Sequence, residues 1–284
     1  MPALIIHGGA GGARTRAARE EIRQSLAGIA RAAWSMVLDG APALDVAVEA
    51  ARMLEDDPLF NAGLGSKLQS DGAARLSAAL MDGEHECFSG VINVEGLLNP
   101  IQLCRHLQTA RDRVLAGEGA LRLARELGLP EGNVITDAAR ENWQRALEGE
   151  TGTIGAVIRD QSGHIAAATS TGGRGMEAVG RVSDSATVAG NFASPGGGAS
   201  CTGIGEDIVD GALAARLVAA LDAGIPLPEA TTALETKMRA RDWKAGIIAL
   251  DAQDRWSAMH TTQVMYWTAI DLGGLHQFHF PELP

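Results

Sequence analysis

The sequence predicts an α+β protein with a mostly antiparallel sheet, and two observations lead to this fold class. Apolar residues recur at helical spacing in two stretches near the start of the chain and in two more near its end. Between them, the β-rich runs 153–159 and 164–171 are joined by Asp160-Gln161-Ser162-Gly163, a hairpin signal. Helices, then hairpin-joined strands, then helices again are typical of α+β folds.

The composition indicates a globular protein whose partner is not nucleic acid. The 284 residues are 46% hydrophobic, which is enough for a large core in one domain, expected over 1–284, or in two. The 24 basic and 35 acidic side chains give a net charge of -11 and are interspersed along the chain. Such a surface repels phosphate backbones, so nucleic acid is excluded as the expected partner. No apolar run approaches the length of a membrane span.

The cysteines and the first residues favour a cytoplasmic location. Cys87, Cys104 and Cys201 are odd in number and form no C-x-x-C pair, so a reducing compartment is expected. The apolar start at 3–6 is too short for a signal-peptide core.

The elements expected before the hairpin follow from local patterns. A short strand precedes a glycine turn, two amphipathic helices follow, and Asp56-Asp57-Pro58 then opens a glycine-rich loop. Two further strand-like runs come next, and a polar helical connector with a break at 128–132 leads to Thr153, where we expect the sheet to start. In order, these elements are expected at 2–6, 8–12, 15–38, 43–54, 61–65, 74–81, 88–94 and 99–147.

The elements expected after the hairpin are helices and strands. Helical periodicity predicts helices over 206–223 and 227–240. Two strands are then expected at 246–250 and 256–260, on either side of the turn Asp251-Ala252-Gln253-Asp254.

Four glycine-flanked segments after the connector carry the candidate chemistry. They place threonines, one arginine and one aspartate at strand ends and turns, where side chains can converge on one pocket. The segments are Thr151-Gly152-Thr153-Ile154-Gly155-Ala156-Val157, Thr169-Ser170-Thr171-Gly172-Gly173, Gly180-Arg181-Val182-Ser183-Asp184-Ser185 and Ser200-Cys201-Thr202-Gly203-Ile204-Gly205-Glu206.

A threonine nucleophile needs a base, and neither a Ser-His-Asp nor a Cys-His arrangement is evident around these threonines. If the chain were cut before Thr153, the new α-amino group, with an ordinary pKa of about 7.7–8.0, could accept the proton from its own Oγ. Gly152 fits such a cut because it lacks a Cβ and can adopt a strained conformation beside the nucleophile. Thr151 is a rival nucleophile, but no glycine precedes it.

These segments resemble the plant-type asparaginases and isoaspartyl peptidases, which are Ntn hydrolases with an N-terminal threonine nucleophile. That family carries Gly-Thr-Val-Gly-Ala-Val, Thr-Ser-Thr-Gly-Gly, Gly-Arg-Val-Gly-Asp-Ser and Thr-Gly-x-Gly-Glu motifs in this order. The resemblance extends upstream to Ile6-His7-Gly8-Gly9-Ala10-Gly11, Asp57-Pro58-Leu59-Phe60-Asn61-Ala62-Gly63, Met81-Asp82-Gly83 and Asn99-Pro100-Ile101.

The resemblance implies a four-layer αββα sandwich that cleaves itself into 1–152 and 153–284. It implies that Thr153 is nucleophile and base, that Thr171 hydrogen-bonds Thr153, and that Thr202 and Gly203 form the oxyanion hole. Arg181 would bind the substrate's α-carboxylate, Asp184 its α-ammonium group, and Gly205 its polar end. The expected activity is hydrolysis of the side-chain amide of L-asparagine, of β-aspartyl peptides, or of both.

The resemblance also implies a structural sodium ion, a homodimer of two-fragment protomers, and no organic cofactor. The ion would be bound by backbone carbonyls of the loop, at Leu54, Glu55, Asp57, Phe60, Ala62 and Leu64. The chain departs from the family at Ser183, where glycine is usual, at Ser77, where aspartate is usual, and at Ala186, where proline is usual. The first two departures are expected to bear on the pocket.

Other interpretations of the same residues remain open. Gly8 to Gly12 follows a strand and precedes a helix, but Arg14 stands where a dinucleotide loop has its third glycine. Arg181 and Asp184 could be a surface pair. The pairs His276 with His279 and His85 with Cys87 lack further metal ligands, and Cys201 is expected to be a small buried hydrophobe. Rival functions are a glycosylasparaginase-type amidase and a non-catalytic homologue that binds an aspartate-like ligand.

Overall fold

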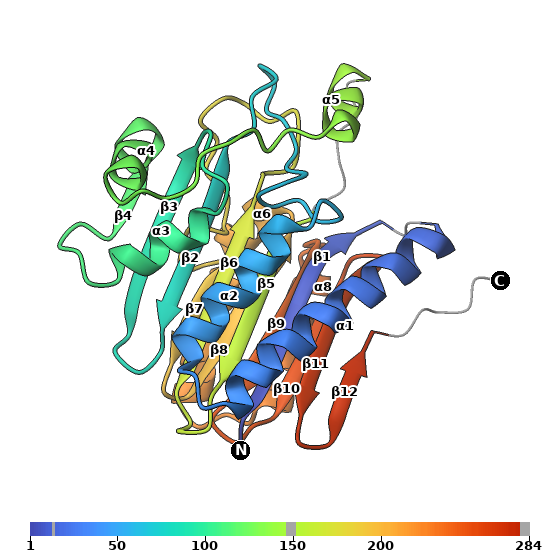
Figure 1. The fold of residues 1–284 in the computed structure, drawn as a ribbon. Helices are drawn as coiled ribbons and strands as arrows, with labels where there is room; N and C mark the ends of the chain where they lie inside the picture. The colour runs from blue at the N-terminus through green and yellow to red at the C-terminus, as the bar shows by residue number, and fades with distance from the viewer. Residues whose placement is uncertain (13–14, 146–151, 279–284) are drawn as a thin grey trace.

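The computed structural model describes residues 1–12, 15–145 and 152–278. Two sheets pack face to face, and helices cover the outer face of each, which gives the expected αββα order of layers (Figure 1). The prediction of an α+β fold with mostly antiparallel sheets is confirmed, since all strand pairs except β3 with β4 are antiparallel.

The larger sheet contains strands from both halves of the chain. Its order is β12-β11-β1-β5-β6-β2-β3-β4, so the expectation that the sheet starts at Thr153 is wrong. The strands are β1 (Ala3–Gly11), β2 (Leu76–Asp82), β3 (Cys87–Val94), β4 (Val114–Ala116), β5 (Ile154–Arg159), β6 (Ile165–Thr171), β11 (Val264–Asp271) and β12 (Gly274–Gln277).

The smaller sheet has the order β10-β9-β8-β7. Its strands are β7 (Asn191–Ser194), β8 (Gly197–Gly203), β9 (Ala245–Asp251) and β10 (Trp256–His260). β8 is central and its residues 197–202 are buried, because one face packs on the larger sheet and the other on helices.

The helices form the two outer layers. On the larger sheet lie α1 (Arg16–Leu38), α2 (Ala43–Asp56), α3 (Pro100–Leu107) and α4 (Gly117–Glu126), with α5 (Asp137–Gln144) on the connector. On the smaller sheet lie α6 (Gly205–Gly211), α7 (Leu213–Asp222) and α8 (Leu227–Ala240). None of the helices within the described ranges is long and apolar enough to cross a bilayer.

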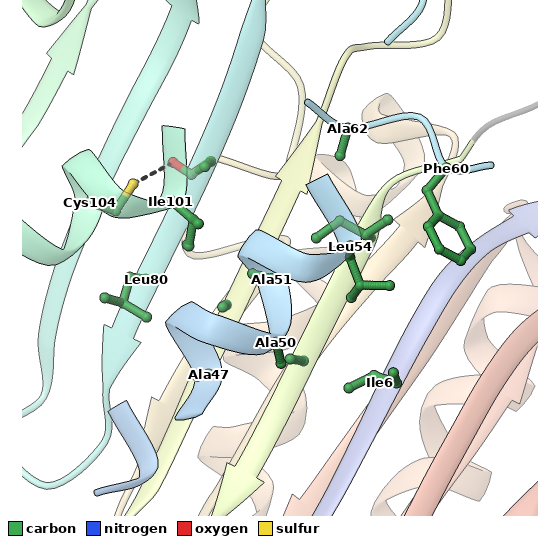
Figure 2. Packing of buried hydrophobic residues seen from close by; sticks show 14 of the residues in the cluster. Ile6, Ala47, Ala50, Ala51, Leu54, Phe60, Ala62, Leu80, Ile101 and Cys104 are labelled. Atoms are coloured by element: carbon green, nitrogen blue, oxygen red, sulfur yellow. Dashed lines mark hydrogen bonds between the residues drawn. The ribbon is translucent and has the colours of Figure 1, made fainter. Parts of the chain in front are cut away.

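Helix α2 positions the segment that precedes the candidate site. Its buried face presents alanines, so the helix lies close to the sheet, and Leu54 packs toward Ile6 and Phe60 (Figure 2). The helix ends at Asp56, two residues before Pro58, and the chain continues into the glycine-rich loop, whose Phe60 and Ala62 join the same core. Burial of this loop's side chains holds Asn61 beside the start of β5.

Candidate active site

The predicted nucleophile lies at the beginning of β5, directly before Ile154. In the β5–β6 hairpin Ile154 pairs with Ser170, so the next position along the register sets Thr153 opposite Thr171. The Thr153 hydroxyl donates to the Thr171 Oγ1 atom at 3.2 Å, and the Gly173 N–H also donates to that atom, at 3.1 Å. Thr153 is 7% exposed. The predicted contact between the two threonines is therefore present.

The peptide bond between Gly152 and Thr153 is fixed by Asn61. The Asn61 N–H donates to the Gly152 carbonyl oxygen at 3.3 Å, and a Cβ on Gly152 would lie 2.9 Å from the Cβ of Asn61. Only glycine fits there without displacing its neighbour. Asn61 was expected in the glycine-rich loop, but its contact with Gly152 could not be predicted, because no local pattern links two segments so distant in the chain.

Strand β8 of the smaller sheet packs against β5 near the site. A Cβ on Gly198 would lie 2.8 Å from Val157 Cγ1, and one on Gly155 would lie 2.0 Å from Ser200 Oγ. The two contacts show that β8 packs on β5, with Gly198 beside Val157 and Ser200 beside Gly155. Thr202 Oγ1 accepts a hydrogen bond from the Ala10 N–H at 3.2 Å, which leaves the hydroxyl hydrogen of Thr202 free to donate elsewhere.

The two predicted charged anchors share one location. A Cβ built on Gly205 would lie 2.8 Å from Arg181 Nη2 and 2.9 Å from Asp184 Oδ1, so both groups lie against the Gly205 backbone. Asp184 is 2% exposed, and its Oδ2 atom has no hydrogen-bond partner among the described residues. Burial raises the pKa of Asp184 to about 7, against the opposing effect of the Arg181 charge.

Two of the three departures from the expected pattern, Ser77 and Ser183, lie near the site. Ser77 pairs with Thr171 across β2 and β6, and its hydroxyl oxygen accepts a hydrogen bond from Asn93 N–H at 3.0 Å. The Asn93 side-chain amide donates in turn to the Arg181 carbonyl at 3.0 Å. Ser183 contacts Gly205, since a Cβ there would be 3.1 Å from the Ser183 Cβ. Ser77 therefore supports the backbone of Arg181.

A buried histidine lies close to the nucleophile, and the sequence analysis assigned it no role. The His7 Nε2 atom is 3.1 Å from Ser200 Oγ, and Ser200 Oγ is 2.6 Å from Thr169 Oγ1. Burial lowers the pKa of His7 to about 3, against a smaller opposing effect from the Thr153 backbone. An efficient base needs a pKa near the working pH. His7 is therefore a poor candidate for the base that activates Thr153.

The loop predicted to bind sodium is closed by hydrogen bonds to its own backbone carbonyls. The Glu55 carbonyl accepts from Leu64 N–H at 2.7 Å, and the Asp57 carbonyl accepts from Phe60 N–H at 3.1 Å. A Cβ on Gly65 would lie 2.7 Å from the Pro58 oxygen and 3.1 Å from the Phe60 oxygen. Backbone carbonyl oxygens suit a hard cation. Of the two oxygens near Gly65, only that of Phe60 belongs to the predicted set, so the sodium site stays a prediction.

The remaining candidates are placed outside the site or outside the described residues. His85 lies 2.8 Å from Asp82, and His276 lies 3.2 Å from Asp271, in two separate pairs. Over 1–12, 15–145 and 152–278 no group of three or more His, Cys, Asp or Glu side chains could hold a metal ion. Cys201 is buried and free, as expected. The rival Thr151 and His279 lie outside the described residues.

Comparisons with known proteins all identify similarity to asparaginases. A family model described as asparaginase matches residues 1–151 and 144–279. An isoaspartyl peptidase/L-asparaginase of Synechocystis sp. is 44% identical over 89% of this chain and 82% of its own length. A protein of the same name from Danio rerio is 34% identical over 97% of this chain and 94% of its own. A plant-type L-asparaginase of Pyrococcus horikoshii is 37% identical over 89% of this chain and 90% of its own.

Proposed function

The chain belongs to the asparaginase family, and from that premise we propose that it is a self-processed amidohydrolase. Its substrates would be the side-chain amide of L-asparagine and β-aspartyl peptides, as the names of its relatives suggest. The observation that carries the proposal is the hydroxyl pair of Thr153 and Thr171, 3.2 Å apart, at the Gly152 peptide bond. Cleavage at this bond would give fragments 1–152 and 153–284.

The proposed reaction uses the amine that cleavage frees on Thr153. The neutral amine takes the proton of its own hydroxyl while Oγ attacks the amide carbon of the substrate. The oxyanion accepts hydrogen bonds from the Thr202 hydroxyl and the Gly203 N–H, and each such donor typically contributes about 2.7–4 kcal/mol. The C–N bond then breaks, and the leaving nitrogen takes the proton from the Thr153 ammonium group. Water then attacks the ester carbon while the Thr153 amine takes its proton. The ester bond breaks, the Thr153 oxygen regains a proton, and L-aspartate is released.

Substrate recognition would depend on two opposite charges. The Arg181 guanidinium would bind the α-carboxylate, and the Asp184 carboxylate would bind the α-ammonium group through its unpartnered Oδ2 atom. The Gly205 backbone, which lies against both, would contact the polar end of the substrate. An ordinary surface ion pair would not leave a buried carboxylate oxygen without a partner. This argument favours the binding role of the two residues.

We also propose a sodium site and a homodimer, which follow from the family resemblance, and a location that follows from the cysteines. The carbonyl-lined loop from Leu54 to Leu64 would hold a sodium ion whose role is to stabilise the loop, with no part in the reaction. The active form would be a homodimer of two-fragment protomers. The free cysteines Cys87, Cys104 and Cys201 support a reducing, cytoplasmic location.

Denaturing electrophoresis, mass spectrometry and substrate turnover test the proposal together. The purified protein should give two fragments, the second beginning at Thr153, and should release ammonia from L-asparagine or aspartate from β-aspartyl-leucine. Thr153→Ala should remain uncut and inactive. An uncut, inactive wild type that still binds L-aspartate would instead identify a non-catalytic homologue. Preferred turnover of glycosylated asparagine would identify the glycosylasparaginase-type amidase.

A further inference from the structure

Glu206 holds the guanidinium group of Arg181 from the solvent side. It follows Gly205 in the first turn of α6, and its two carboxylate oxygens accept from Arg181 Nε at 2.8 Å and Nη2 at 2.9 Å. The Arg181 side chain is 13% exposed and that of Glu206 is 54% exposed. A bidentate pair of this kind fixes the plane of a guanidinium group as well as its position.

Asp184 is an alternative partner for the same guanidinium. Arg181 Nη2 and Asp184 Oδ1 both lie within 3 Å of the position that a Cβ on Gly205 would occupy. The described residues nevertheless include no ion pair between Arg181 and Asp184, and Asp184 Oδ2 has no hydrogen-bond partner. A direct pair between them would occupy the Asp184 carboxylate, whereas the pair with Glu206 uses Nε and Nη2 of Arg181 and leaves Nη1 and the Asp184 carboxylate to a ligand.

We propose that Glu206 is a positioning residue, which holds the Arg181 guanidinium away from Asp184 so that both charges stay available to a zwitterionic ligand. The inference rests on the proposed function, because it assumes that Arg181 and Asp184 bind the two charges of an aspartyl group. Glu206 is the partner that Arg181 contacts by two hydrogen bonds, whereas Glu177 and Asp184 act on it through charge alone. Arg174 acts on Glu206 through its charge in the same way.

Because the Glu206 side chain is largely exposed, its positioning role can be tested separately from any contribution to folding stability. Exposed ion pairs contribute little to folding, so removal of the Glu206 carboxylate should leave the melting temperature and the self-cleavage unchanged. Without that carboxylate, Arg181 should turn to the buried Asp184. Both anchors should then lose affinity for ligand together, although only Arg181 contacted the altered residue.

Two competitive inhibitors test this consequence in the processed enzyme. L-Aspartate carries all three charged groups of the product, whereas β-alanine lacks the α-carboxylate and keeps the ammonium group. In Glu206→Ala both inhibition constants should rise about 10- to 100-fold, the range expected for loss of a hydrogen bond to a charged group. Glu235→Ala, which breaks an exposed Glu–Arg pair on α8, should leave both constants unchanged.

The outcomes separate the inference from the proposed function. Unchanged inhibition constants in Glu206→Ala, or a rise for L-aspartate alone, would overturn the inference while the wild type remains active. Glu206→Gln keeps the size of the side chain but retains only one of the two acceptor oxygens. It should therefore give an intermediate rise in both inhibition constants. A processed wild type that neither turns over L-asparagine or β-aspartyl-leucine nor binds L-aspartate would overturn the proposed function itself.

Discussion

Replacement of Gly205 by alanine should weaken substrate binding without preventing self-cleavage. The added Cβ would lie 2.8 Å from Arg181 Nη2, 2.9 Å from Asp184 Oδ1 and 3.1 Å from the Ser183 Cβ. Carbon atoms normally keep about 3.5–4.0 Å from such neighbours, so both anchors must move by roughly 0.5–1 Å. Loss of one hydrogen bond to a charged group costs about 1.5–3 kcal/mol, which corresponds to a rise in KM of about 10- to 100-fold.

The assay is ammonia release from L-asparagine, with KM and kcat measured on protein whose processing has been checked by electrophoresis. The turnover number should change much less than KM, because the Thr153–Thr171 pair does not contact Gly205. Gly28→Ala on the exposed face of α1 is the matched control, since nothing lies within 4 Å of a Cβ there. A KM for Gly205→Ala equal to that of the wild type would refute the placement of the anchors around Gly205.

Three further predictions follow from the same geometry. Thr171→Val removes the hydroxyl that contacts Thr153. In steady-state assays kcat should fall about 10- to 100-fold while KM stays near the wild-type value. An unchanged kcat would refute the role of Thr171 in supporting the nucleophile. Burial raises the pKa of Asp184 to about 7, so its carboxylate takes up a proton and loses its charge as the pH falls below about 7. The KM for L-asparagine should therefore rise in that range. A KM that does not change with pH there would contradict the role of Asp184 as the ammonium anchor. Burial also raises the pKa of Glu55 from 4.5 to about 8, so the folded state retains a proton that the unfolded chain has lost. Stability is thus lost as the pH rises from about 4.5 to about 8, by up to about 1.4 kcal/mol per pH unit, and thermal melts over this range should show a smaller decline for Glu55→Gln.

The hairpin at the centre of the site could be predicted from the sequence, but its register could not. The expected turn Asp160-Gln161-Ser162-Gly163 would pair Arg159 with His164, whereas the loop also contains His164 and Arg159 pairs with Ile165. Once Arg159 pairs with Ile165, Thr153 must lie opposite Thr171. The contact of the two hydroxyl groups is thus a local consequence of one turn.

Contacts between distant segments could not be predicted in this way. β1 continues through the expected glycine turn to Gly11, with a shift of register between His7 and Ala10, because β11 pairs with it on the other side. β11 and β12 were missed, as were β7 and β8, whose small residues give little strand signal. The helix expected over 206–223 is two helices, α6 and α7, which meet at Ala212 in the left-handed conformation with φ 45°.

The order of strands in the larger sheet explains how a cut before Thr153 could leave the fold intact. β5 and β6 lie between β1 and β2, and β11 pairs with β1 on its other side, so strands from 1–152 and 153–284 interleave. Neither fragment could form this sheet alone, since each would leave unpaired edges that the other fragment normally covers. β5 begins at Ile154, so the cut would break no pair between strands. It would free the amine of Thr153 at a strand end, where Thr171 and the Gly152 carbonyl are already held.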